Sequence, residues 1–150
     1  MKTLNNGTHW ITTENIISNF LLKETACPCG CGFNQPHQAL IDCLQMIREY
    51  LDIPIKINSC CRCEKENARV GGVHNSYHTQ GMAADIAVFD EAEGHDLESE
   101  KLFLAINFLE IPTIIRYEGR YFCHIDVRAG THRLTKNPEG FYIPIGPDTA

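Results

Sequence analysis

A carboxylate inside a run of apolar residues is the feature that most constrains this chain. Asp85 stands in the otherwise apolar stretch 83–89, whose composition predicts a buried strand. Burying a carboxylate is costly unless it is paired with a cation or binds a metal ion. His78 lies in the polar loop that leads into this strand. Because histidine and aspartate together suit Zn²⁺, the stretch suggests one half of a metal site.

A third metal ligand has to come from another part of the chain, and His124 is the best candidate. It lies in the run 121–127, where polar side chains alternate with apolar ones as in a strand. A catalytic zinc ion typically has three protein ligands and one open position for water, and His78, Asp85 and His124 match that number. Such a water ionises near neutral pH and can attack a carbonyl group. Taken singly, each residue has a plain structural alternative, as a surface or core histidine or a buried acid that binds backbone groups.

Hydrolysis by a metal-bound water also needs a general base within hydrogen-bond reach. Asp126 and Glu118 are the candidates, with Asp90 as a weaker one. Asp126 should share its face of the strand with His124, two residues before it. Glu118 belongs to a predicted hairpin turn that could fold over the same site. Arg62 could offer a fixed positive charge to a substrate carboxylate or to a developing oxyanion, although a surface arginine in a weak ion pair is the plain alternative.

Composition narrows the class of protein. The chain has 150 residues, 43% of them hydrophobic and 21% charged, which suits one domain with a proper core. A net charge of -6 argues against a nucleic-acid-binding protein. No apolar run approaches the roughly 18 residues that span a membrane. Residues 1–14 lack the apolar segment of a secretory signal, so we expect synthesis in the cytoplasm without a signal peptide.

Eight cysteines are an unusual number for such a chain, and six of them form two tight groups, 27/29/31 and 60/61/63. Neither group has the C-x2-C spacing that is typical of structural zinc sites. Without a signal peptide, free thiols or metal thiolates are expected rather than disulfides. We favour free cysteines that pack as small hydrophobic residues. A second zinc site built from C-x-C pairs is the alternative.

The spacing of apolar residues predicts an α+β domain, with hairpin-linked strands in a small antiparallel sheet and helices flanking it. Helices are expected at 36–50, 64–70 and 98–109, and strands at 54–59, 83–89, 113–117, 121–127 and, at an edge, 141–145. The chain after Arg128 is otherwise expected to be loop. Residues 1–150 form one domain with an irregular N-terminal arm over about 1–35, in which 1–13 are frayed and a short helix runs from Glu14 to Leu22.

Four segments taken together resemble the peptidase M15 family. They are NSCCRC at 58–63, NARVGGV at 67–73, NSYHTQGMAADI at 75–86 and FCHIDVR at 122–128. The resemblance is to the zinc D-Ala-D-Ala carboxypeptidase-like branch, which includes phage endolysins and other murein peptidases, and it covers roughly residues 36–128. It implies the fold of the hedgehog-type zinc domain, a small antiparallel sheet with flanking helices.

By position, the resemblance implies that His78, Asp85 and His124 bind zinc. It likewise implies that Arg62 anchors the substrate and that Ser76 is the polar residue beside the first ligand. This chain departs from the family's pattern in two places. Other members often carry E-x-x-H before the last histidine, where this chain has a tyrosine at position 121. Asp126 is therefore the expected base and Glu118 the fallback. The cysteines at 60 and 61 replace a usual Gly-Tyr pair, which affects the wall of the substrate pocket.

The implied activity is that of a zinc-dependent hydrolase of the bacterial cell wall. The expected enzyme is a D,D-carboxypeptidase or murein endopeptidase that cleaves peptide bonds involving D-amino acids in peptidoglycan stem peptides or crosslinks. We expect a monomer that binds neither nucleic acid nor a membrane. It would reach the cell wall after release or by another export route. The alternative is a non-catalytic binding module that keeps both the fold and the zinc.

Overall fold

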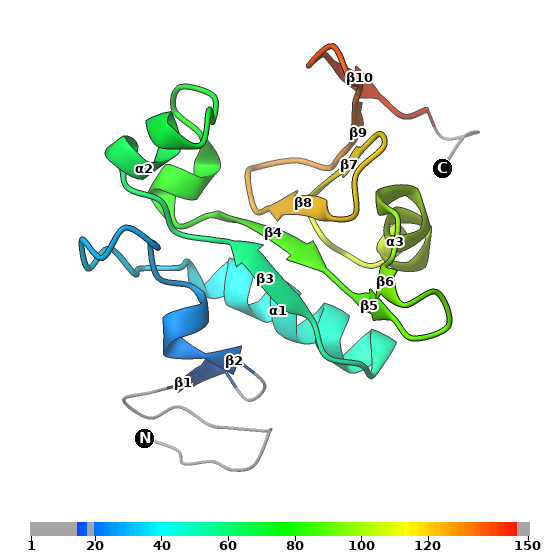
Figure 1. The fold of residues 1–150 in the computed structure, drawn as a ribbon, viewed down its shortest axis with the longest axis horizontal. Helices are drawn as coiled ribbons and strands as arrows, with labels where there is room; N and C mark the ends of the chain where they lie inside the picture. The colour runs from blue at the N-terminus through cyan, green and yellow to red at the C-terminus, as the bar shows by residue number, and fades with distance from the viewer. Residues whose placement is uncertain (1–14, 18–19, 147–150) are drawn as a thin grey trace.

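A computed structural model describes residues 15–17 and 20–146, and a six-stranded sheet forms the centre of this part of the chain (Figure 1). The strand order is β10-β9-β7-β8-β4-β3. These strands are β3 (Lys56–Ser59), β4 (Ala83–Ala87), β7 (Thr113–Tyr117), β8 (Cys123–Asp126), β9 (His132–Lys136) and β10 (Tyr142–Pro144). Neighbouring strands are antiparallel except β7 and β9, which pair in parallel.

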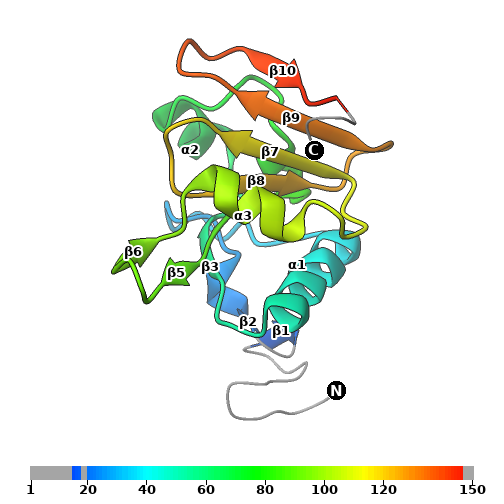
Figure 2. The ribbon, with the colours of Figure 1, turned by 90° about the vertical axis from the view of Figure 1, so that its right-hand side faces the viewer.

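Two helices cover one face of this sheet. They are α1 (Gln38–Leu51) and α3 (Ser99–Ile106), and Figure 2 shows α3 lying across β7 and β8. Side chains on strands alternate between the two faces, so every second residue of β4 and β8 points into the core beneath the helices. The fully buried residues at the centre of that core are Leu44, Ile47, Ala84, Ile86, Phe103, Ile106, Ile114 and Ile125. The residues between them, Asp85 and His124 included, therefore face away from the helices.

Shorter elements surround the sheet. A helix α2 (Glu64–Arg69) follows β3, and a 3-10 helix η2 (Tyr77–Gln80) leads into β4. Two small two-stranded sheets pair β1 (Asn15–Ile17) with β2 (Phe20–Leu21), and β5 (Phe89–Asp90) with β6 (His95–Asp96). A further 3-10 helix, η1, spans Leu22–Glu24. Within the described part of the chain, no helix is long and apolar enough to cross a membrane.

The α+β class and the flanking helices are confirmed, and two local expectations are wrong. Within the range Glu14 to Leu22, where a helix was expected, the described residues instead form the paired strands β1 and β2, and Leu22 begins η1. The loop expected after Arg128 contains β9, which has few apolar residues but pairs with both β7 and β10. Backbone pairing with two neighbours, rather than apolar alternation, holds this strand. The frayed arm expected at residues 1–13 lies outside the described residues.

Candidate metal centre

The sheet brings Asp85 and His124 side by side. The two residues are direct partners in the antiparallel ladder between β4 and β8, so both side chains leave the same face of the sheet. His78 reaches the same place from η2. Gly81 ends η2 with a φ of 71°, and a Cβ atom there would lie 2.2 Å from the carbonyl oxygen of Gln35. Only glycine fits this turn, which joins the histidine loop to β4.

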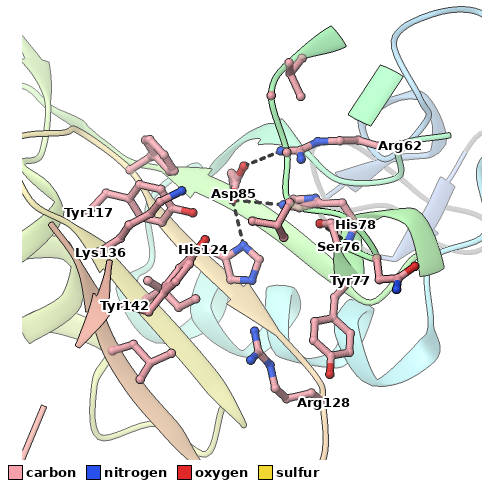
Figure 3. Close-up of a pocket in the computed structure, with 18 residues that line it drawn as sticks. Arg62, Ser76, Tyr77, His78, Asp85, Tyr117, His124, Arg128, Lys136 and Tyr142 are labelled. Carbon is pink, nitrogen blue, oxygen red and sulfur yellow. Dashed lines mark hydrogen bonds and ion pairs between the residues drawn. The ribbon is translucent and has the colours of Figure 1, made fainter. Parts of the chain in front are cut away.

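Two histidine nitrogens point at one carboxylate oxygen. Nε2 of His78 lies 3.3 Å and Nδ1 of His124 lies 3.2 Å from Oδ1 of Asp85, as the dashed lines in Figure 3 show. The three ligand atoms lie within 4.8 Å of one another. His78 is 2% exposed, His124 7% and Asp85 9%, so solvent reaches the three side chains only at their cavity edge. This arrangement can hold a metal ion with two nitrogen ligands and one oxygen ligand.

Each histidine has a hydrogen-bond partner at its other ring nitrogen. Nδ1 of His78 donates to the carbonyl oxygen of Cys60 at 2.8 Å, which leaves the lone pair of Nε2 free for a metal. Nε2 of His124 lies 2.7 Å from Oδ2 of Asp126, which leaves Nδ1 free in the same way. Such outer partners fix the tautomer and orientation of metal-binding histidines in proteins. The donor set therefore fits a divalent metal ion.

The charges of the site shift the pKa values of its members. Burial acts to raise the pKa of the Asp85 carboxyl, but hydrogen bonds from His124 and His78 outweigh it and hold that pKa well below its usual range. Burial likewise opposes the low pKa of Asp126, which follows from its bonds to His124 and Arg128. Burial acts to lower the pKa of His124, but the carboxylates of Asp126 and Asp85 raise it above its ordinary value. Metal-free His124 therefore tends to keep a proton that a metal ion would displace.

A cavity of about 470 Å³ opens above these three residues. Three cationic side chains line it: Arg62, Arg128 and Lys136. Among the described residues that line it, Asp85 is the only acid. The cavity is therefore positive although the whole chain carries a net charge of -6, and it favours an anionic group of a ligand.

The expected general bases are not brought into this cavity. Asp126 is fully buried behind the ring of His124, and both its carboxylate oxygens accept hydrogen bonds from Arg128. Glu118 is exposed in the turn between β7 and β8 and lines a different hollow, beside Arg116. Asp90 lies in β5 and also lines a separate hollow. None of the three carboxylates faces the space between the candidate metal ligands.

Arg62 lines the same cavity, at the rim of the site. Its guanidinium donates to Ser59 Oγ at 2.9 Å, to Asn67 Oδ1 at 3.0 Å and to Asp85 Oδ2 at 3.2 Å. These three hydrogen bonds fix the orientation of the guanidinium group, which faces Oδ2 of Asp85, the carboxylate oxygen that the histidines leave free. Ser76 also lines the cavity, where its Oγ accepts a hydrogen bond from the backbone N–H of His78.

Three residues with polar groups in the cavity wall escaped the sequence analysis: Tyr117, Lys136 and Tyr142. They lie on β7, β9 and β10, and Figure 3 shows them on the side of the cavity opposite His78. In the parallel pairing of β7 with β9, Lys136 lies opposite Tyr117. In the antiparallel pairing of β9 with β10, it lies opposite Tyr142. Its Nζ lies 5.3 Å and 5.1 Å from the two ring centroids. The turn signal Asn-Pro-Glu-Gly at 137–140, between two short runs, could have revealed this β9–β10 hairpin.

Comparison with known proteins adds a family to this geometry. A family model described as Peptidase M15 matches residues 15–126, which is more than half of the chain and includes all three candidate metal ligands. No curated protein matches the chain.

Proposed function

The chain belongs to the peptidase M15 family of metal-dependent peptidases, and from that premise we propose that it is a zinc peptidase of the bacterial cell wall. Its substrates would be peptide bonds that involve D-amino acids in peptidoglycan stem peptides or crosslinks. The observation that carries the proposal is the convergence of His78 and His124 on one oxygen of Asp85, at the floor of a positive cavity.

Zinc is the metal that this donor set suits best. Two imidazoles and one carboxylate form a common set of ligands for catalytic zinc, and three protein ligands leave a position open toward the cavity. His78, Asp85 and His124 would hold the ion. Zinc bound there would supply a Lewis acid and lower the pKa of a water molecule.

The cavity supports a substrate that carries a carboxylate. Peptidoglycan stem peptides end in a free carboxylate and carry others along their length. Arg62 is held rigid by three hydrogen bonds, and Arg128 lies with its guanidinium carbon 4.5 Å from the Tyr77 ring centroid. Fixed guanidinium groups bind carboxylates in a two-point manner that an ammonium group cannot reproduce. We assign the anchoring of the substrate carboxylate to Arg62, with Arg128 and Lys136 adding positive charge around it.

Asp126 is better placed to position His124 than to carry a proton. It binds the ring nitrogen opposite the candidate metal-binding nitrogen, and Arg128 satisfies its remaining lone pairs. A carboxylate in this place raises the basicity of the histidine and fixes its orientation.

One observation favours a second candidate function, a zinc-containing binding module without turnover. Within the described lining of the cavity, no carboxylate other than Asp85 stands where a general base would. The positive cavity would then bind an anionic peptide and leave it intact.

Product analysis separates the two functions. Purified protein saturated with zinc would be incubated with muropeptides that contain D-Ala-D-Ala ends and crosslinks, and the products identified by mass spectrometry. Hydrolysis that His78→Ala abolishes and Glu118→Gln preserves supports the peptidase. Binding of intact muropeptides without products supports the binding module. If neither binding nor hydrolysis occurs with the metal bound, the proposed substrate class is wrong.

A further inference from the structure

Four cysteines from two distant segments meet at one point of the surface. Cys27, Cys29 and Cys31 lie in the loop that precedes α1, and Cys63 lies between β3 and α2. Their four sulfur atoms lie within 4.8 Å of one another. Within the described residues, the other four cysteines are buried in the protein. The two groups seen in the sequence are thus divided differently in space.

The spacing of the sulfur atoms is that of a metal tetrahedron. The Sγ–Sγ distances are 3.5 Å from Cys27 to Cys29, 3.8 Å from Cys27 to Cys63 and 3.6 Å from Cys29 to Cys63. Four thiolates at the usual zinc–sulfur distance of about 2.3 Å form a tetrahedron whose edges are about 3.8 Å. A disulfide would instead need a sulfur–sulfur distance of about 2.05 Å. The cysteines are free, and the fourth sulfur atom, that of Cys31, lies within 4.8 Å of the other three.

The loop sequence explains how three cysteines so close in the chain can converge. Gly30 and Gly32 have φ angles of 85° and 92°, so the chain turns sharply after Cys29 and again after Cys31. The N–H of Gly30 also donates to the carbonyl oxygen of Cys27 at 3.4 Å. The two left-handed glycines make C-x-C-x-C a workable set of ligands although it lacks the usual C-x2-C spacing.

Backbone N–H groups point at two of the sulfur atoms. The N–H of Cys63 donates to Sγ of Cys27, and the N–H of Glu66 donates to Sγ of Cys63, both at 3.4 Å. Hydrogen bonds to sulfur stabilise the negative charge of a thiolate, which is the form that binds metals.

We propose that Cys27, Cys29, Cys31 and Cys63 bind a structural zinc ion, separate from the site at His78. Four protein ligands close the coordination shell, so this ion stabilises the fold and takes no substrate. It fastens the loop before α1 to the segment that leads from β3 into α2, and these two segments lie side by side in Figure 1. A backbone hydrogen bond from the N–H of Cys61 to the carbonyl oxygen of Thr25, at 3.0 Å, also joins them.

The ion would also steady the cavity wall. Cys63 is next to Arg62, whose backbone N–H donates to the carbonyl oxygen of His78 at 3.1 Å. Fixing Cys63 therefore holds both the arginine fork and the histidine loop in place. The protein without this ion should retain the three ligands at His78, Asp85 and His124 but hold Arg62 less firmly.

Metal counting on the full-length chain tests the proposal. Protein purified under reducing conditions with zinc should contain two zinc ions per chain, whereas His78→Ala and the double variant Cys29→Ser/Cys63→Ser should each contain one. Cys43→Ala, which removes a core cysteine outside the cluster, should retain two. After replacement of zinc by cobalt, the near-ultraviolet thiolate-to-cobalt band should persist in His78→Ala and disappear in the double cysteine variant.

A second measurement, on proteins that keep all their cysteines, covers the case in which the double variant does not fold. An organomercurial reagent that blocks thiols should release one zinc ion from wild-type protein and one from His78→Ala. The proposal is overturned if His78→Ala releases none, or if it shows no thiolate-to-cobalt band. It is also overturned if reduced wild-type protein holds zinc only at His78. Failure of the peptidase activity would leave these readouts unchanged, because none of them depends on hydrolysis.

Discussion

Asp126 holds the ring of His124 on the side opposite Asp85. Its Oδ2 lies 2.7 Å from Nε2 of His124, while Nδ1 of the same ring lies 3.2 Å from Oδ1 of Asp85. The imidazole is thus fixed between two carboxylates, one of which faces the cavity while the other is fully buried. This relationship gives the two aspartates different roles, as candidate metal ligand and as positioning residue.

Replacing the positioning carboxylate should weaken metal binding without removing a ligand. We expect Asp126→Asn to reduce the affinity for zinc at this site by about 10- to 100-fold, the usual effect of losing an outer carboxylate partner. Competition with a chromophoric chelator measures this. Glu118→Gln is the matched control, because Glu118 is exposed and lines no part of the metal cavity, and it should bind zinc like the wild type. Equal affinities in the two variants would show that Asp126 does not support His124.

The titration of His124 in metal-free protein provides a second test. Burial acts to lower the pKa of His124, but the carboxylates of Asp126 and Asp85 raise it above its ordinary value. We expect the ring proton resonances to titrate above the ordinary value of about 6.5. In Asp126→Asn the midpoint should fall, because one of the two carboxylates is gone. An unchanged midpoint in this variant would contradict the assignment.

The same shift makes a prediction about stability. A histidine whose pKa is higher in the folded than in the unfolded state contributes stability below the unfolded value, and that contribution is lost as the pH rises through the folded value. The difference in unfolding free energy between metal-free wild type and Asp126→Asn should therefore be largest between about pH 5 and pH 6 and shrink as the pH rises through that folded value. It should also shrink in acid, below the unfolded pKa of Asp126 near about 3.9, because the lowered pKa of this carboxyl contributes stability only while it is ionised. Urea denaturation of both proteins at a series of pH values measures this difference. A gap that widened with rising pH would contradict the prediction.

Arg62 should act through the geometry of its fork as well as its charge. Arg62→Lys keeps the charge but loses the hydrogen bonds that the guanidinium makes to Ser59, Asn67 and Asp85. Since a charged hydrogen bond contributes about 1.5–3 kcal/mol, we expect kcat/KM for muropeptides to fall roughly 10- to 150-fold. Arg69→Lys, at an exposed arginine paired with Glu66, should leave the rate unchanged. Comparable rates in the two variants would remove Arg62 from substrate binding.

Substitutions at the adjacent glycines Gly71 and Gly72 test the position of Arg62 in the cavity wall. A Cβ on Gly72 would lie 2.0 Å from Oδ1 of Asn67 and 2.9 Å from a guanidinium nitrogen of Arg62. Gly72→Ala must therefore displace the Asn67 amide, and with it the Arg62 nitrogen that donates to that amide. We expect activity to fall roughly 10²-fold, as small misplacements of binding groups do. Gly71→Ala meets open space and costs about 1–2 kcal/mol of backbone strain at its φ of +74°. Steady-state kinetics and thermal unfolding of both variants should separate lost activity from lost stability. Full activity in Gly72→Ala together with a large loss of activity in Gly71→Ala would contradict the packing of Arg62 against Gly72.

The sequence pointed to the candidate metal ligands mainly through Asp85, because a carboxylate is costly inside an apolar strand. Asp85 interrupts an apolar strand, and His124 lies in another strand that pairs with it. The general base could not be assigned in this way. Strand alternation put Asp126 on the face of His124, but spacing does not show which edge of an imidazole a carboxylate approaches.

The far wall of the cavity was missed for a different reason. Lys136 lies on β9, whose sequence His-Arg-Leu-Thr-Lys lacks the apolar alternation of a half-buried strand. Tyr142 lies on β10, which the sequence did predict as an edge strand at 141–145, but without its partner β9. Their place depends on the parallel pairing of β9 with β7, a contact between distant segments. The cysteines show the same limit, since Cys63 leaves its sequence neighbours in the core to join the loop before α1.

Anomalous diffraction from crystals grown with zinc tests the central claim most directly. Data collected above and below the zinc absorption edge should give a peak about 2.0–2.2 Å from Nε2 of His78, Oδ1 of Asp85 and Nδ1 of His124. A map in which zinc occupies other sites while this one shows no peak would contradict the account of the metal centre.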